Sequence, residues 1–152
     1  MAVWGISCHL EHAEPVVVAI SATGPRGALR GEEVFRHRAN PKVSWGEKLR
    51  ELASHLEATL ERAKPDAVVV RSMDWTRFRK ESTARPRYQV EGVLLEVATR
   101  LGVPTQALSG QDIGRLLKTT KALAEAEAKG AFGGDEDAGS AAIAALALVG
   151  QA

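Results

Sequence analysis

The chain has 152 residues, of which 45% are hydrophobic and 26% charged, and its formal net charge is +1. This length suits a single domain over residues 1–152 with a real hydrophobic core, and the composition excludes wholesale disorder. The near balance of 20 basic and 19 acidic residues excludes a polybasic module or an acidic solubiliser at the level of the whole chain. A single cysteine, Cys8, favours a reducing compartment. We see no leader pattern and no apolar run of the roughly 20 residues that a membrane helix needs, so we expect a cytoplasmic protein.

Three extended segments come first along the chain. Val3–Cys8 predicts a buried strand, and the β-branched run within Pro15–Ser21 predicts a second. Glu33–Arg38 alternates and predicts a third, after a turn at Gly24–Gly27. Because these strands follow one another directly, we expect them to form an antiparallel meander.

A long helix is predicted to begin after Ser44 and to end before Pro65. Ser44 and Glu47 have the spacing of a capping box. The apolar residues of this segment recur every three or four positions and form one stripe. They are Trp45, Leu49, Leu52, Leu56, Leu60 and Ala63. Asp66–Arg71 follows as a fourth strand, whose continuous apolar centre is typical of a strand covered on both faces.

The second half of the chain alternates helices with one more strand. The predicted elements are a helix over about 87–101, a strand over 103–108, a short helix near 112–117 and an Ala-rich helix over about 135–149. Residues 118–134 are the loosest part, either an amphipathic helix or a partly disordered loop. The order β-β-β-α-β-α-β-α predicts an α/β fold, a mixed five-stranded sheet with helices on both faces.

Four local motifs occur at matching places in this order. They are Trp4-Gly5-Ile6-Ser7, Val68-Val69-Val70-Arg71, Gln89-Val90-Glu91-Gly92 and Asp137-Ala138-Gly139-Ser140-Ala141. They are similar to a first strand of the form Gly-Ile-Asp, a fourth strand ending in Glu, a helix with Gln-Ala-Arg-Gly and a last helix with Asp-Ala-x-Asp-Ala. The chain thereby resembles the RuvC-type Holliday-junction resolvases of the ribonuclease H-like superfamily over most of its length. The resemblance implies a homodimer that acts in DNA recombination and repair.

The resemblance also implies a nuclease centre in which four carboxylates hold two Mg²⁺ ions. The matching positions here are Ser7, Arg71, Asp137 and Ser140, of which only Asp137 is acidic. Arg71 would put a cation where a divalent metal should lie, and that repulsion is costly at close range. We therefore expect a catalytically degenerate protein, a pseudo-nuclease without a metal or another cofactor.

An active Mg²⁺-dependent resolvase or other nuclease with relocated ligands is the alternative. Its ligands would be Asp137, Asp135 and Asp74, with Glu11 and Glu136 also near in sequence. Asp135 and Asp137 equally fit a helix start, where a carboxylate caps the backbone and is favoured by the helix dipole. The segment Cys8–His12 holds four potential metal ligands, but its spacing matches no zinc motif, so we expect a plain buried thiol at Cys8.

Residues 71–88 combine cations with aromatic side chains. The cations are Arg71, Arg77, Arg79, Lys80, Arg85 and Arg87, and the interleaved aromatics are Trp75, Phe78 and Tyr88. Cations neutralise phosphates, and aromatic rings stack on unpaired bases. This segment predicts a protein that binds DNA or RNA, branched or single-stranded. Two alternatives stay open, a solvated surface loop whose aromatics pack on the core, and a dimeric protein-interaction scaffold that binds no nucleic acid.

Overall fold

The computed structural model describes residues 2–23, 30–74, 81–133 and 135–149, so the turn predicted at Gly24–Gly27 lies outside the described residues. The strands are β1 (Val3–Glu11), β2 (Glu14–Thr23), β3 (Arg30–Arg38), β4 (Ala67–Arg71) and β5 (Thr105–Leu108). The helices are α1 (Trp45–Ala63), α2 (Glu81–Arg100), α3 (Gly110–Leu116), α4 (Lys121–Ala131) and α5 (Glu136–Val149).

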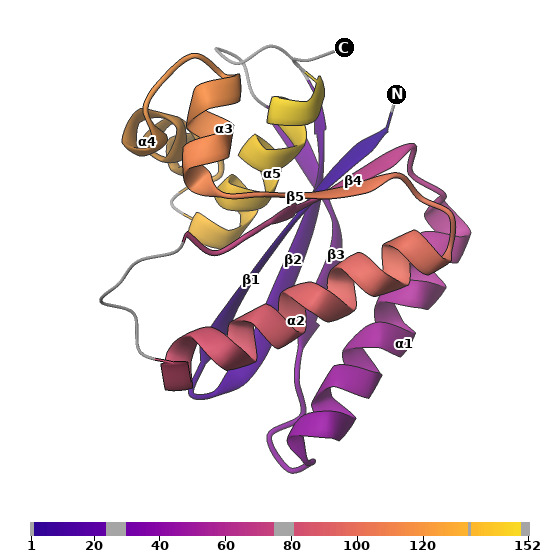
Figure 1. Ribbon diagram of the computed structural model, residues 1–152. Helices are drawn as coiled ribbons and strands as arrows, with labels where there is room; N and C mark the ends of the chain where they lie inside the picture. The colour runs from indigo at the N-terminus through magenta and orange to yellow at the C-terminus, as the bar shows by residue number, and fades with distance from the viewer. Residues whose placement is uncertain (1, 24–29, 75–80, 134, 150–152) are drawn as a thin grey trace.

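The five strands form one mixed sheet in the order β3-β2-β1-β4-β5 (Figure 1). β1, β2 and β3 pair antiparallel, which confirms the predicted meander. β4 and β5 add in parallel on the other side of β1. The carboxyl ends of β1, β4 and β5 therefore lie at the same edge of the sheet, where ligands bind in open α/β sheets.

Helices cover both faces of the sheet, as predicted (Figure 1). α1 and α2 pack on one face and bury the predicted stripe of Leu52, Leu56 and Leu60. α5 crosses the other face, with α3 and α4 beside it. Val68–Val70 are fully buried because their side chains alternate between these two layers. In the described part of the chain, no helix has both the length and the apolar character that crossing a membrane requires.

The Ala-rich α5 approaches β1 very closely. The contact occurs at Gly5, where an added Cβ would overlap the carbonyl oxygen of Ala141 and lie 2.9 Å from the amide nitrogen of Ala145. Only a residue without a side chain fits there, and alanines on α5 leave the helix free to come this near.

Three helices differ in detail from the sequence prediction. α2 begins at Glu81 instead of Arg87, because the helix continues through Pro86 and loses only one backbone hydrogen bond there. The loose segment 118–134 contains α4, capped by Thr120. The Ser44 hydroxyl accepts the amide of Glu47 as predicted, but the Glu47 carboxylate pairs with Arg50 and does not complete the capping box.

A pair of histidines joins β3 to α1 on the outer side of the sheet. Nδ1 of His37 lies 3.0 Å from Nδ1 of His55, and the Phe35 ring packs against both imidazoles. Nε2 of His37 is buried and has no hydrogen-bond partner among the described residues. Burial, followed by the neighbouring His55, lowers the pKa of His37, and Glu51 opposes that shift.

We expect this pair to make the stability of the fold fall as the pH drops from about 7 to about 5. In that window the unfolded chain binds a proton at His37 before the folded chain does, so the free energy of unfolding decreases with decreasing pH. Urea titrations at several pH values should show a smaller decrease for His37→Phe than for the unchanged protein. His12→Asn, a change at an exposed turn histidine, is the matched control, and equal slopes for His37→Phe and the unchanged protein would contradict the prediction.

Candidate functional site

The four positions that match the resolvase motif meet at the carboxyl edge of the sheet. β1 and β4 pair in parallel with Ile6 opposite Val70, and this register places Ser7 next to Arg71. Gly5, Ser7 and His9 alternate toward the face that α5 covers, and α5 carries Asp137 and Ser140. The four positions named from the sequence therefore lie near one another, and Asp137 is the only carboxylate among them.

Arg71 lies buried in this site and is held by acidic partners. Its side chain is only 8% exposed, and Nη2 is 3.2 Å from Asp74 Oδ2 and 2.9 Å from Glu125 Oε1. Nη1 also donates to the Ser72 carbonyl. The Lys121 ammonium pairs with the same Asp74 carboxylate. Arg71, Asp74, Lys121 and Glu125 form what we term the charge network, which ties the end of β4 to α4.

The charge network controls the ionisation of Asp74. Burial alone would raise the pKa of this carboxyl group, but the Lys121 ammonium and the Arg71 guanidinium outweigh burial and lower the pKa below its usual value. The carboxylate stays ionised and stays bound to these two cations. The Asp74 carboxylate therefore already has two cationic partners within the protein.

Asp137 pairs with a histidine from β1. Its Oδ2 lies 2.8 Å from Nδ1 of His9, and the other ring nitrogen of His9 is 3.6 Å from Glu11 Oε2. Glu11 in turn accepts a 2.7 Å hydrogen bond from Arg38, which is the main reason why the pKa of Glu11 is lowered. Burial raises the pKa of Asp137, and His9 works against the increase.

Asp135 caps α5, as its position at the helix start predicts. Its Oδ1 accepts the Ala138 amide at 3.0 Å, and its Oδ2 pairs with Arg36 at 3.2 Å. The cap and Arg36 lower the pKa of Asp135, with the cap contributing most. Glu136 pairs with Lys129 at 2.8 Å. Each of these carboxylates thus has a partner within the protein.

This donor set does not fit a pair of Mg²⁺ ions. Two Mg²⁺ ions need several ionised oxygen ligands around one point. Here Ser7 and Ser140 are hydroxyls, Arg71 is a cation, and Asp137 faces His9. Within the described residues, no three His, Cys, Asp or Glu side chains come together in a way that could hold a metal ion.

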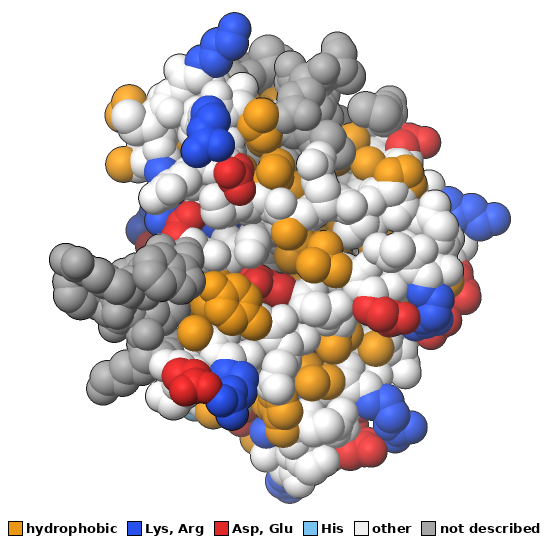
Figure 2. Space-filling view, in the orientation of Figure 1, with side chains coloured by type: hydrophobic (Ala, Val, Ile, Leu, Met, Phe, Trp, Pro, Cys, Tyr) orange, Lys and Arg blue, Asp and Glu red, His pale blue; other side chains and the backbone are white. Residues whose placement is uncertain are grey.

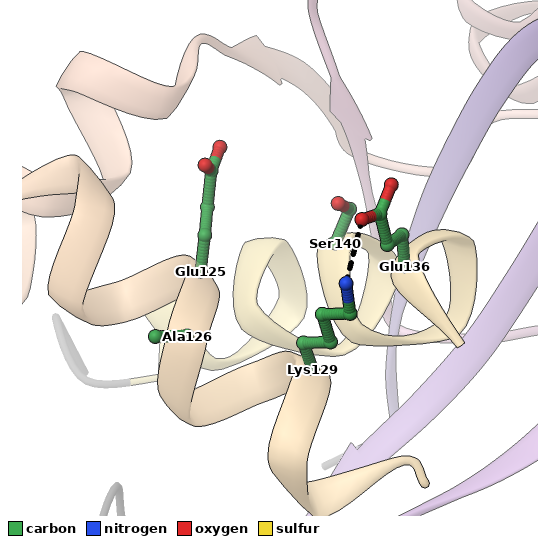
Figure 3. Close-up of a pocket in the computed structure, with 5 residues that line it drawn as sticks. All are labelled: Glu125, Ala126, Lys129, Glu136 and Ser140. Carbon is green, nitrogen blue, oxygen red and sulfur yellow. Dashed lines mark hydrogen bonds and ion pairs between the residues drawn. The ribbon is translucent and has the colours of Figure 1, made fainter. Parts of the chain in front are cut away.

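A pocket opens between α4 and α5 beside the charge network (Figure 3). It has a volume of about 320 Å³ and is lined by Glu125, Ala126, Lys129, Glu136 and Ser140. The Lys129–Glu136 pair crosses it, and Glu125 projects from α4 to one side of that pair. The pocket carries charges of both signs and no concentration of acidic groups.

The predicted nucleic-acid segment is only partly described. Trp75, Arg77, Phe78, Arg79 and Lys80 lie outside the described residues. The described cations are Arg71, in the charge network, and Arg85 and Arg87 on α2, where the predicted aromatic Tyr88 is exposed. Arg85 is exposed and pairs with Glu81, whereas Arg87 is half-buried with Nε 3.7 Å from Glu91 Oε1. Figure 2 shows acidic and basic side chains interspersed over one face of the molecule, in keeping with the net charge of +1.

Glu91 is a buried residue of the Gln89–Gly92 motif, and the sequence alone assigned it no role of its own. It accepts the Met73 amide at 2.6 Å and lies 3.4 Å from the Ser72 hydroxyl, so it fixes the backbone just after β4. Burial raises its pKa, against the opposing effect of the Met73 amide and Arg87. The sequence could have indicated burial, because Glu91 lies among the apolar residues Val90, Val93 and Leu94 of the predicted helix.

Cys8 is a free, buried thiol, as expected. It lies in the core under α1 and α2, whereas its neighbour His9 faces α5, so the two side chains diverge. Burial is the main cause that raises the pKa of Cys8 to about 12, and a thiol with that pKa is not a nucleophile at neutral pH.

We compared the chain with known families, curated proteins and solved structures. No protein-family model matches the sequence, and no curated protein sequence matches it. The structure of Thermus thermophilus RuvC superposes with a TM-score of 0.70 at 20% identity, covering 99% of this chain and 94% of the other. The chain has the RuvC fold.

Two further RuvC-fold structures agree with this result. T. thermophilus RuvC in complex with Holliday junction substrate superposes with a TM-score of 0.69 at 20% identity, covering 99% of this chain and 94% of the other. The yeast mitochondrial Holliday junction resolvase gives a TM-score of 0.56 at 13% identity, covering 98% of this chain and 78% of the other. At these identities the RuvC fold is shared, and the chemistry of the site has to be argued from the residues of this chain.

Proposed function

We propose that this RuvC-fold protein binds branched or single-stranded nucleic acid and does not cut it by a two-metal mechanism. The observation that carries the proposal is the position of Arg71. Its guanidinium lies at the end of β4 with Asp74 and Glu125 bound to it. Because both carboxylates pair with the Arg71 guanidinium, their negative charge is neutralised and does not attract a divalent metal.

The nucleic-acid part of the proposal is based on the segment between β4 and α2. Arg71 and Arg87 are engaged inside the protein, by the charge network and by Glu91. Phosphate binding is therefore assigned to Arg77, Arg79, Lys80 and Arg85, with Trp75 and Phe78 as stacking residues. Support comes from the RuvC fold, since one protein with this fold was solved in complex with a Holliday junction substrate.

The proposal is tested with a labelled four-way DNA junction, a matched duplex and a matched single strand, each with Mg²⁺ or Mn²⁺ at two salt concentrations. We expect salt-sensitive binding without cleavage. Cleavage would overturn the pseudo-nuclease assignment and favour an active nuclease with relocated ligands, in which Asp137→Ala should abolish the reaction. We also propose that the protein is a homodimer, and light scattering on the same samples tests this.

The triple variant Arg77→Ala/Arg79→Ala/Lys80→Ala should bind at least about tenfold more weakly at low salt and should reduce the salt slope by about 3, because each cation that neutralises a phosphate releases about one counterion. Gel titration at several salt concentrations measures both quantities. Arg50→Ala/Arg62→Ala/Lys64→Ala, which removes three exposed cations at α1, is the control with the same change in net charge. Equal weakening in both variants would mean that the segment 77–80 has no special role in binding.

A further inference from the structure

A second pocket lies at the start of α2, next to the tip of the β1–β2 hairpin. It has a volume of about 310 Å³ and is lined by Leu10, Ala13, Trp45, Ser82 and Pro86. Trp45 provides the aromatic surface, and its indole is fixed because Nε1 donates to Gln89 Oε1 at 2.8 Å. The pocket is mainly apolar, so it suits a flat ring better than a charged group.

The pocket also borders a backbone carbonyl whose usual helix donor is missing. Pro86 lies inside α2 and has no N–H group, so it cannot donate to the Ser82 carbonyl as residue 86 would in an ordinary helix. A helical carbonyl points along the axis toward the residue four positions ahead, here Pro86, and both residues line the pocket. A ligand with an N–H group can supply the hydrogen bond that the helix cannot. The Ser82 hydroxyl provides a second polar group, which can donate or accept.

A charged hollow adjoins the apolar pocket. It has a volume of about 290 Å³ and is lined by Glu81, Ser82, Arg85 and Pro86, so Ser82 and Pro86 are shared by the two hollows. Arg85 pairs here with Glu81, and their side chains are 67% and 76% exposed. An ion pair this exposed contributes little stability, and a phosphate can replace the carboxylate.

The geometry points to a nucleotide site, in which an unpaired base enters the pocket of Trp45 and Pro86 and its phosphate contacts Arg85. This inference depends on the proposed function and names the part of a nucleic acid that the protein holds. The stacking surface, the Ser82 carbonyl and the adjoining cation match the ring, the N–H groups and the phosphate of one nucleotide. An extruded base at a strand branch and a base in a single strand both have this form.

The test compares two fluorescein-labelled 12-mers by anisotropy. One is single-stranded oligodeoxyadenosine, and the other has the same backbone with abasic sugars at alternate positions. We expect the unchanged protein to prefer the oligomer with all its bases by about tenfold, since stacking of one base contributes on the order of 1–3 kcal/mol. Ser82→Phe, which fills the pocket, should remove most of this preference and keep the salt dependence.

Two further variants separate loss of the pocket from a general effect of the substitution on the protein. Ser54→Phe, on the exposed side of α1, is the matched control and should keep the preference. Pro86→Ala restores the N–H group that pairs with the Ser82 carbonyl, so it should fold at least as well and still reduce the preference. Preference retained in both Ser82→Phe and Pro86→Ala overturns the nucleotide site. If the unchanged protein binds neither oligomer nor the four-way junction, the proposed function itself fails.

Discussion

Gly5→Ala should destabilise the fold more than any other change considered for this chain. We expect the free energy of unfolding to decrease by more than about 3 kcal/mol, because the new methyl group would overlap the Ala141 carbonyl and force α5 away from β1. Urea unfolding followed by circular dichroism measures the loss. A variant that does not fold at all gives the same answer through its yield and its spectrum.

Gly92→Ala is the matched control for this prediction. Gly92 lies in α2, and an added Cβ there meets nothing within 4 Å. The change should leave stability equal or raise it by roughly 0.5–1 kcal/mol, the difference in helix propensity between glycine and alanine. A decrease of less than about 1 kcal/mol for Gly5→Ala would show that α5 does not lie as near to β1 as the structure has it.

Arg71→Met should have the next largest effect on stability, a decrease of about 2 kcal/mol. The change leaves the Asp74 and Glu125 carboxylates close together without the guanidinium between them. Removing one partner of a buried pair costs about 3–5 kcal/mol, but Glu125 is 40% exposed and Lys121 still pairs with Asp74, so the expected value is smaller.

Comparison with an exposed arginine separates this effect from a general loss of charge. Arg62→Met on α1 removes the same charge at a solvent-exposed position and should change stability by less than about 0.5 kcal/mol. Arg71→Met/Glu125→Gln should recover part of the loss, since it removes one of the two stranded carboxylates. Equal stability of Arg71→Met and Arg62→Met would mean that the charge network contributes nothing to the fold.

The architecture was predictable because burial imposes patterns that a single sequence shows. The stripe of Leu52, Leu56 and Leu60 and the run Val68–Val70 each correspond to one element packed against the sheet. The start of α2 was not predicted, since Pro86 is normally a helix boundary and this helix continues through it. α4 was left open because it buries only small side chains, Ala124 and Ala128, which give a weak periodic signal.

The sequence indicated where the candidate site lies in the fold, but it did not indicate which side chains form ion pairs there. The motifs placed Ser7, Arg71, Asp137 and Ser140 at one sheet edge, and the structure brings them there. One partner of Arg71 is Glu125, 54 positions away, and nothing local to either residue indicates the other. The His9–Asp137 contact likewise depends on how α5 crosses β1. Contacts of this kind are set by tertiary packing, which the local pattern of residues does not encode.

The charge network has a consequence for how position 71 can evolve. Arg71 is surrounded by Asp74 and Glu125, so an acidic residue at this position would face two carboxylates with only Lys121 to balance them. A single substitution therefore does not lead to a usable metal ligand, because its neighbours would have to change as well. The arginine is entrenched by epistasis, and its replacement by a carboxylate becomes tolerable only in a background where α4 no longer carries Glu125.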